Sequence, residues 1–267
     1  MSTAFLFRDR IADAWIGETG PACITTLPLS NVRDAQPRVR ARWTTTTGVG
    51  IWCDLGASYE IGCIALIATT LGLAGGSPTV RARVSDDAGF ATSAWDTGAI
   101  DPETSDACAG NVVLIHPTSA SGRFIQIDLE DAAAAELDIG RIVAGPLWRL
   151  AHSWAYGAEE GRLVLDRRDR NPDTGAEFPR RAAFNPRQAR FSLPYVSRTE
   201  ARDEWRTMLD TLGAAGDALW IPDDSLSLAE LNRRCIWGSP VLPEASAVLQ
   251  RAGFTHHTGS FALTERT

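Results

Sequence analysis

Histidines come first among residues that could do chemistry, because they serve most often in acid–base catalysis and in binding transition metals. The chain has four: His116, His152 and the adjacent pair His256 and His257. Neighbouring residues on a strand point to opposite faces, so the pair cannot hold one metal ion by itself. We expect the pair to lie in a surface turn and predict no metal site.

Paired carboxylates are the next candidates, because glycoside hydrolysis needs two acids on either side of the scissile bond. Three pairs occur, each in a predicted turn where acids are solvated: Asp86 with Asp87, Asp101 with Glu103, and Glu159 with Glu160. The sequence also contains no GxSxG, HExxH, P-loop or dinucleotide-binding motif. We therefore predict that the chain is not an enzyme, with no catalytic residue and no cofactor.

Tryptophan could bind ligands by stacking on the face of a sugar ring. Trp43, beside Arg40 and Arg42 before a predicted strand, is the best candidate for such a ligand-binding site. The alternative is that Trp43 packs in the core. Trp52 and Trp148 lie inside apolar strands, and we expect both to be core residues.

The charge of the chain limits its partners. The formal net charge is −7, and all 26 basic residues are arginine. A general nucleic-acid binder needs clustered cations, and a net charge of −7 argues against that class. We also predict no direct sequence-specific binding of nucleic acid. The five cysteines are scattered without a CxxC motif, which is typical of reduced, buried thiols. They are Cys23, Cys53, Cys63, Cys108 and Cys235.

Neither a membrane span nor a secretory signal is expected. The longest apolar stretch, residues 61–75, is interrupted by threonine and glycine and is shorter than the ~20 residues of a spanning helix. The first ten residues lack a basic flank followed by an apolar run. We expect a soluble protein that stays where it is made.

Residues 1–150 carry the elements that must position the candidate ligand site. Residues 79–84 and 122–129 alternate apolar and polar side chains, and residues 61–70 form an apolar run closed by glycine turns. Six or more short strands at this spacing predict an antiparallel β-sandwich. The phrases Leu-Ser-Asn-Val-Arg-Asp at 29–34 and Ile-Trp-Cys-Asp-Leu-Gly at 51–56 open the pattern. Arg-Phe-Ile-Gln-Ile at 123–127 and residues 137–145 close it.

In this order, the phrases resemble the galactose-binding-like (discoidin-type) jelly roll, over roughly residues 22–150. The resemblance implies that residues 1–150 form a jelly-roll β-sandwich domain.

Residues 151–267 read as a second, α+β domain. Residues 162–190 are an Arg-rich arm, expected as an exposed hairpin around the turn at 171–175. Ser197 and Glu200 form a capping box before a helix with Trp205 on its apolar face, and Gly213 ends this helix. Strands are expected at 218–222, 235–238, 239–242 and 259–266.

This order of strands and helix is similar to the tube-type domain of long-tailed phage tails, a β-sandwich with one flanking helix. The resemblance implies a mainly β chain and a structural virion protein of the phage tail tip, made in the host cytoplasm. It would form a ring, hexameric or trimeric, at the distal end of the tail tube, with the tube and other tail-tip proteins as partners. The alternative is a carbohydrate-binding adhesin module that attaches to glycans on the bacterial surface, which for a phage is the surface of its host.

The arm is the candidate inter-subunit contact. Its arginines suit bidentate pairing with carboxylates of a neighbouring copy: Arg167, Arg168, Arg170, Arg180 and Arg181. The expected acidic counterpart is Asp210, Asp217, Asp223 and Asp224. The alternatives are a solvated loop and, less favoured because aromatics are few, a nucleic-acid patch.

Overall fold

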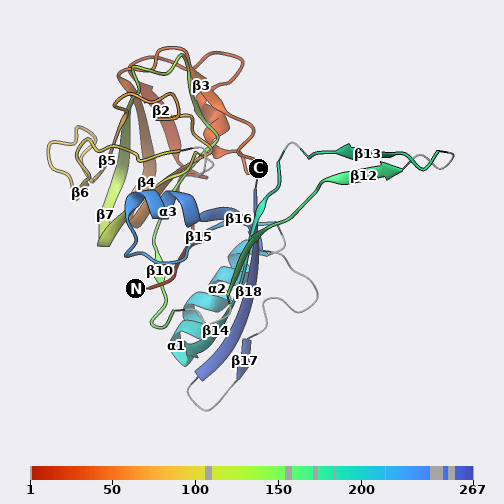
Figure 1. The fold of residues 1–267 in the computed structure, drawn as a ribbon. Coiled ribbons are helices and arrows are strands. Elements are labelled where there is room, and N and C mark those ends of the chain that lie inside the picture. Colours follow the sequence, from red (N-terminus) through yellow and green to blue (C-terminus); the bar gives the residue numbers. More distant parts are fainter. Residues whose placement is uncertain are drawn as a thin grey trace.

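A computed structural model describes residues 2–105, 110–153, 158–170, 174–182, 184–213, 215–240, 249–251 and 256–266 (Figure 1). The chain is mainly β, as predicted, with two large sheets and two small ones. None of the helices in these ranges is long and apolar enough to cross a membrane.

The first large sheet has the strand order β2-β4-β7-β5-β6, with β9 also paired to β4. Its strands are β2 (Trp15–Thr19), β4 (Val49–Ile67), β5 (Thr79–Ser85), β6 (Trp95–Asp96), β7 (Val112–Glu130) and β9 (Arg141–Gly145). A small sheet of β3 (Ala41–Trp43) and β8 (Leu137–Ile139) and a 3₁₀ turn (Leu29–Arg33) complete the predicted β-sandwich. All of these pairings are antiparallel.

The two halves of β4 are buried differently, and their sequences show why. In its first half, Ile51 and Cys53 face the core while Trp52 and Asp54 point outward, which is the alternation of a half-exposed strand. From Ile61 to Ile67 every residue is buried. A strand with apolar residues on both faces must be covered on both sides, so this half lies between two layers.

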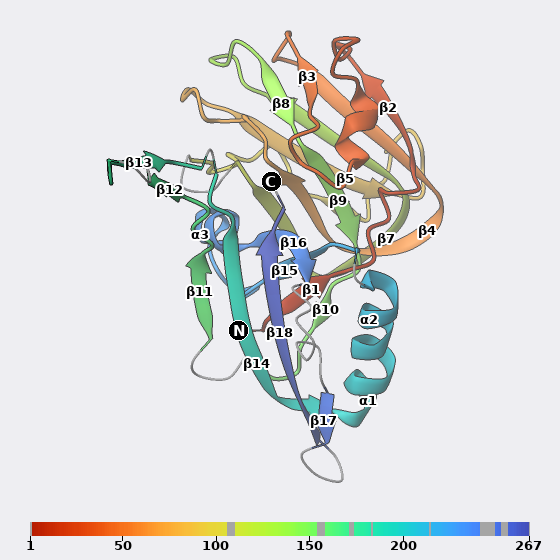
Figure 2. The same ribbon diagram turned by 90° about the vertical axis from the view of Figure 1, so that its right-hand side faces the viewer.

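The second large sheet has the order β10-β1-β15-β16-β18-β14-β11, with β17 on β18 (Figure 2). Its strands are β1 (Ala4–Leu6), β10 (Trp148–Arg149), β11 (Glu159–Arg162), β14 (Arg187–Ser197), β15 (Ala218–Ile221), β16 (Ile236–Pro240), β17 (Leu249–Arg251) and β18 (His256–Glu265). The domain division predicted at residue 150 follows the order of the sequence and not the pairing of the strands. In space, β1 and β10 precede that point and nevertheless pair in this second sheet.

A shared apolar layer joins this sheet to the sandwich. Cys63, Ala65 and Val113 of the sandwich pack with Leu219 and Trp237 of the second sheet in one buried cluster. Helix α3 (Leu228–Arg234), which the sequence reading did not anticipate, also contributes to this cluster. The two parts therefore form one continuous body.

The predicted capped helix covers the other face of the second sheet. It comprises α1 (Arg198–Glu200), a π-helical turn (Ala201–Trp205) and α2 (Arg206–Leu212). The capping box between Ser197 and Glu200 is present, and Gly213 has a positive φ of 49° at the helix end. Trp205 is fully buried, which confirms its predicted core position.

The C-terminal region corrects two expectations. His256 and His257 are the first residues of β18 and pair with Ser197 and Val196, so the pair lies in a strand rather than a turn. Of the two short strands expected at 235–238 and 239–242, the described residues form one strand, β16, preceded by α3, and residues 241–242 lie outside the described part of the chain.

Candidate functional site

The predicted ligand site at Trp43 is not an open surface. Trp43 lies in β3, and its side chain is 0% exposed in the sandwich core. Its ring therefore offers no face on which a sugar could stack. Trp43 is therefore a core residue, which was the alternative considered from the sequence.

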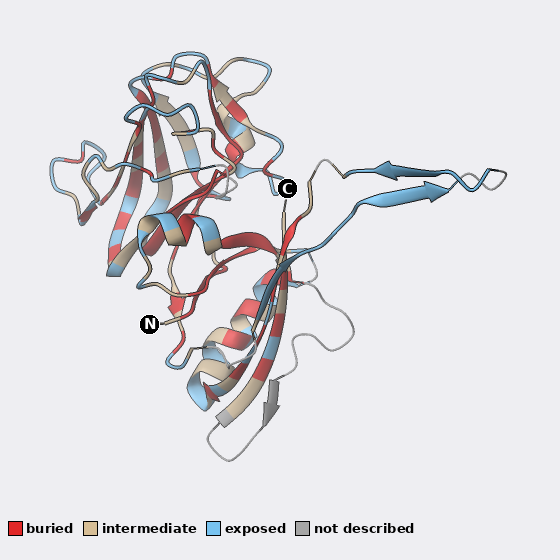
Figure 3. Cartoon of the chain, in the orientation of Figure 1, coloured by how far each residue is buried: buried red, intermediate tan, exposed pale blue. Residues whose placement is uncertain are grey.

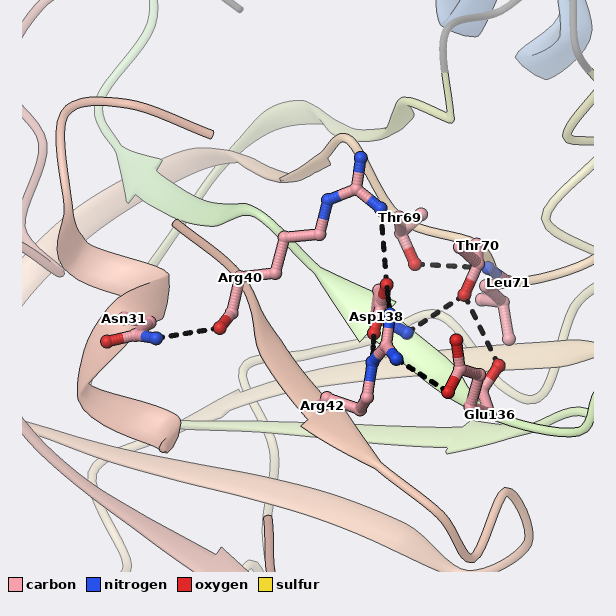
Figure 4. Close-up of polar contacts among 8 residues, drawn as sticks. All are labelled: Asn31, Arg40, Arg42, Thr69, Thr70, Leu71, Glu136 and Asp138. Carbon is pink, nitrogen blue, oxygen red and sulfur yellow. Dashed lines mark hydrogen bonds and ion pairs between the residues drawn. The ribbon is translucent and has the colours of Figure 1, made fainter. Parts of the chain in front are cut away.

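Arg40 and Arg42 converge on Asp138 of β8, as Figure 4 shows. Arg42 donates from Nε to Oδ1 at 2.7 Å and from Nη2 to Oδ2 at 2.8 Å, and Arg40 donates to Oδ2 at 3.2 Å. Arg42 also pairs with Glu136 at 2.7 Å. The side chain of Asp138 is only 2% exposed. Burial acts to raise the pKa of Asp138, but the hydrogen bonds from the two arginines outweigh it and hold the pKa below its ordinary value.

This cluster fastens β3 and the preceding loop to β8. Asn31 adds a hydrogen bond to the Arg40 carbonyl at 2.7 Å, which ties the 3₁₀ turn to the same place. Arg40 and Arg42 lie together in the structure, and their guanidinium groups bind the internal carboxylate of Asp138. A ligand at these two arginines stays a prediction.

The paired carboxylates have local structural partners. Asp87 accepts hydrogen bonds from the amides of Gly89 and Ala91, which lower its pKa. Glu103 accepts from the Ala229 amide at the start of α3, and Glu160 pairs with Arg234. In the described ranges, no group of three or more His, Cys, Asp or Glu residues is placed to hold a metal ion.

The Arg-rich arm is the most prominent feature of the surface. β12 (Arg167–Arg170) and β13 (Glu177–Arg180) form an antiparallel hairpin that projects from the body (Figure 1). Every residue of both strands is exposed (Figure 3). Arg180 pairs with Asp169 at 3.2 Å, and Arg168 with Glu177 at 3.7 Å.

The arm also exposes apolar side chains, on β13 and in the segment between β11 and β12. Val164 is 66% and Phe178 58% exposed, and Leu163 and Leu165 are exposed as well. These four are half of the eight large hydrophobic residues found exposed in the described ranges. The sequence predicted the charges of the arm but not this group of exposed apolar side chains.

The predicted acidic counterpart of the arm needs a correction. Asp217 accepts a hydrogen bond from Arg266 at 2.8 Å, and Asp224 is held by Arg149 and Ser2. Asp223 accepts from the Ser225 amide in a turn. Asp210 on α2 is exposed. Asp217 and Asp224 therefore pair with arginines of the same chain.

The sequence reading also missed an aromatic cluster on the outer face of the sandwich. Trp15 of β2 is 63% exposed and meets Trp52 of β4, which in turn stacks on Phe124 of β7. Trp52 was expected in the core. The alternation along β4 was the available signal, because Ile51 and Cys53 facing inward require Trp52 to face outward.

Comparison with known proteins gives a likeness of fold for half of the chain. The sequence matches no protein-family model and no curated protein. Among solved structures, CBM32-1 from a family 31 glycoside hydrolase of Clostridium perfringens is similar, with a TM-score of 0.43, 11% identity and coverage of 52% of this chain and 99% of that one.

Two other solved structures are similar over the same share of this chain. The Streptococcus pneumoniae fucose binding module SpX-3 gives a TM-score of 0.40 at 10% identity, covering 52% of this chain and 98% of that one. A chitosan-binding module of a chitosanase/glucanase from Paenibacillus sp. IK-5, solved with chitotriose, gives 0.38 at 13% identity, covering 52% and 100%. Because these TM-scores are low, the assignment of a jelly-roll-like β-sandwich rests on the strand order of this chain.

Proposed function

We propose that this chain is a structural subunit that assembles with further copies of itself through its arm. The observation that carries the proposal is the hairpin β12–β13 with its exposed apolar residues. A two-stranded hairpin without a core is at best marginally stable in water, so its natural state includes a surface against which it packs. Phe178 and Val164 would be buried by such a contact.

Charge favours another copy of the chain as the partner. Residues 161–190 carry eight arginines and four acids, a net +4, whereas residues 1–150 carry 11 arginines and 17 acids, a net −6. An arm that meets a different surface on the next copy is a heterologous contact, which closes into a ring when the rotation allows it. A hexameric or trimeric ring in the tail tip of a long-tailed phage is the specific assembly we propose.

Deletion of residues 167–181 tests this function. Sedimentation velocity over a range of concentrations should show self-association of the full chain that the deletion weakens strongly. The circular dichroism spectrum should stay unchanged, because every residue of the deleted strands is exposed and the fold of the single subunit does not depend on them. Equal association of both proteins, or monomers throughout, would overturn the proposal. For the phage assignment, mass spectrometry of purified virions should find the chain in a multiple of three or six copies.

A second candidate function is attachment to surface glycans by the sandwich. The similar modules are named for fucose and for chitosan, but it is the outer-face aromatic cluster of this chain that favours the function. Since Trp43 is buried, a glycan would have to use a surface other than the one expected from the sequence.

A further inference from the structure

The outer face of the sandwich carries three aromatic rings on three adjacent strands. The ring centroids of Trp15 and Trp52 lie 5.2 Å apart with planes at 74°, and those of Trp52 and Phe124 lie 5.3 Å apart in a stacked arrangement at 22°. Trp52 and Phe124 are largely covered, whereas Trp15 is 63% exposed. The cluster thus supports one broad, accessible indole ring.

Gly17 holds this indole ring in place. A Cβ atom built on Gly17 would lie 2.7 Å from two carbons of the Trp15 ring, so the ring rests on the bare backbone of its own strand. The outer edge of the six-membered ring packs against Gly17, and the ring of Trp52 lies beside it at an interplanar angle of 74°. A side chain that is already fixed loses little rotamer freedom when a ligand binds, so the ring is a preorganised platform.

Polar groups adjoin the platform. Asp54 lies directly across from Trp15 in the β2–β4 ladder, and it receives a forked pair of hydrogen bonds from Arg123, both at 2.7 Å. Gln126 lies directly across from Trp52 on β7. Carboxylates keep further acceptor positions and guanidinium groups further donors when they pair in this way. Such groups can bind the hydroxyl groups of a ligand.

Most charges on this face are paired, and the exposed carboxylate of Glu130 at the end of β7 leaves the face without an excess of cations. Three aspartates and three arginines of β4, β5, β6 and β7 form three ion pairs, which are Asp54–Arg123, Asp96–Arg81 and Asp128–Arg83. A phosphate-rich or strongly acidic ligand would be drawn to an excess of cations, which this face does not have. A neutral ligand with many hydroxyl groups fits the balance.

We propose that the outer face of β2, β4 and β7 binds a neutral glycan, with a pyranose ring stacked on Trp15 and its hydroxyl groups bonded to Asp54 and Arg123. A protein partner would require a larger apolar core than one exposed ring among paired charges. The proposal rests on the second candidate function above and assigns its site.

The test uses the full chain on an array of neutral and anionic oligosaccharides that includes chitotriose, followed by calorimetric titration of the strongest neutral binder. Trp15→Ala should weaken binding about tenfold or more, because loss of a stacking surface commonly has that effect. Gly17→Ala keeps the indole but displaces it, and should weaken binding by a smaller factor. Phe178→Ala removes an aromatic residue of similar exposure on the arm and should leave the affinity unchanged.

The outcomes separate the site from the function. If the chain binds no neutral glycan, both the glycan-binding function and this site are overturned. If it binds one and Trp15→Ala binds it equally well, the site is wrong while the function stands. Preference for anionic glycans would also overturn the proposal. A thermal melt of each variant checks that it is folded. Trp15→Ala should melt near the temperature of the native chain, because an exposed ring contributes little to stability.

Discussion

Asn232 of α3 is the sharpest test of the finding that the sandwich and the second sheet share one core. Its side chain is fully buried. Its Oδ1 accepts a hydrogen bond from the Val113 amide at 2.8 Å, and its Nδ2 donates to the Pro102 carbonyl at 2.7 Å. Both partners belong to the sandwich, so this one side chain fastens α3 to it.

The replacement Asn232→Ala would leave two buried backbone groups without partners. Each such group costs about 1–3 kcal/mol, so the free energy of unfolding should fall by roughly 2–6 kcal/mol. A loss of about 4 kcal/mol in a chain of this size lowers the melting temperature by roughly 8–16 °C. Asn185→Ala is the matched control, because Asn185 accepts a hydrogen bond from the Leu165 amide at an exposed position within the arm.

Urea unfolding, followed by both tryptophan fluorescence and circular dichroism, measures the effect. In the native chain the two signals should change together in one transition, as expected for one body. The control should differ from the native chain by less than about 1 kcal/mol. A change that small for Asn232→Ala, or two separate transitions in the native chain, would refute the shared core.

Three further predictions concern the arm, an ion pair and a thiol. An arginine-specific protease should cut the native chain first within residues 162–190, and early cuts within 40–145 would contradict a compact sandwich. The hydrogen bonds from Arg81 lower the pKa of Asp96 to about 2. Because this lies below the ordinary 3.8, the pair stabilises the fold above that pH and its contribution is lost as the pH falls towards 2. In an NMR titration, Arg81→Ala should raise the pKa of Asp96, and an unchanged value would assign the shift to another cause. Burial raises the pKa of Cys53 to about 12, so its thiol should resist a disulfide reagent at pH 8 until the protein unfolds; rapid native labelling would contradict its burial.

Local patterns predicted much of the fold. Alternation along residues 79–84 corresponds to β5, with Val80 and Val84 in the core, and the capping box at Ser197 begins the predicted helix. Helix α3 was missed although Ser227 and Glu230 have capping-box spacing, and Ser227 does cap the helix. Its seven residues are too few for a clear helical period. The pairing of β1 with β15 joins residues more than 200 positions apart, which no local pattern encodes.

The candidate site was harder to predict, because exposure depends on tertiary neighbours. Trp43 and Trp15 each stand near arginines and apolar residues in the sequence. Trp43 is enclosed because β3 pairs with β8 over the sandwich core. Trp15 remains exposed on a face that no other layer covers in the described structure, where its ring packs against Gly17 and Trp52.

The shared core gives the two proposals a common consequence. Arg141 of the sandwich lies 4.8 Å from the ring of Trp237 in the second sheet, and Asn232 fastens the same junction. The arm follows directly from β11 and leads back into β14 of that second sheet. A subunit anchored by its arm would therefore hold the Trp15 platform in a fixed orientation. Several platforms held in this way would bind a repetitive glycan surface far more tightly than one, so weak binding by each single chain would suffice for an assembled attachment protein.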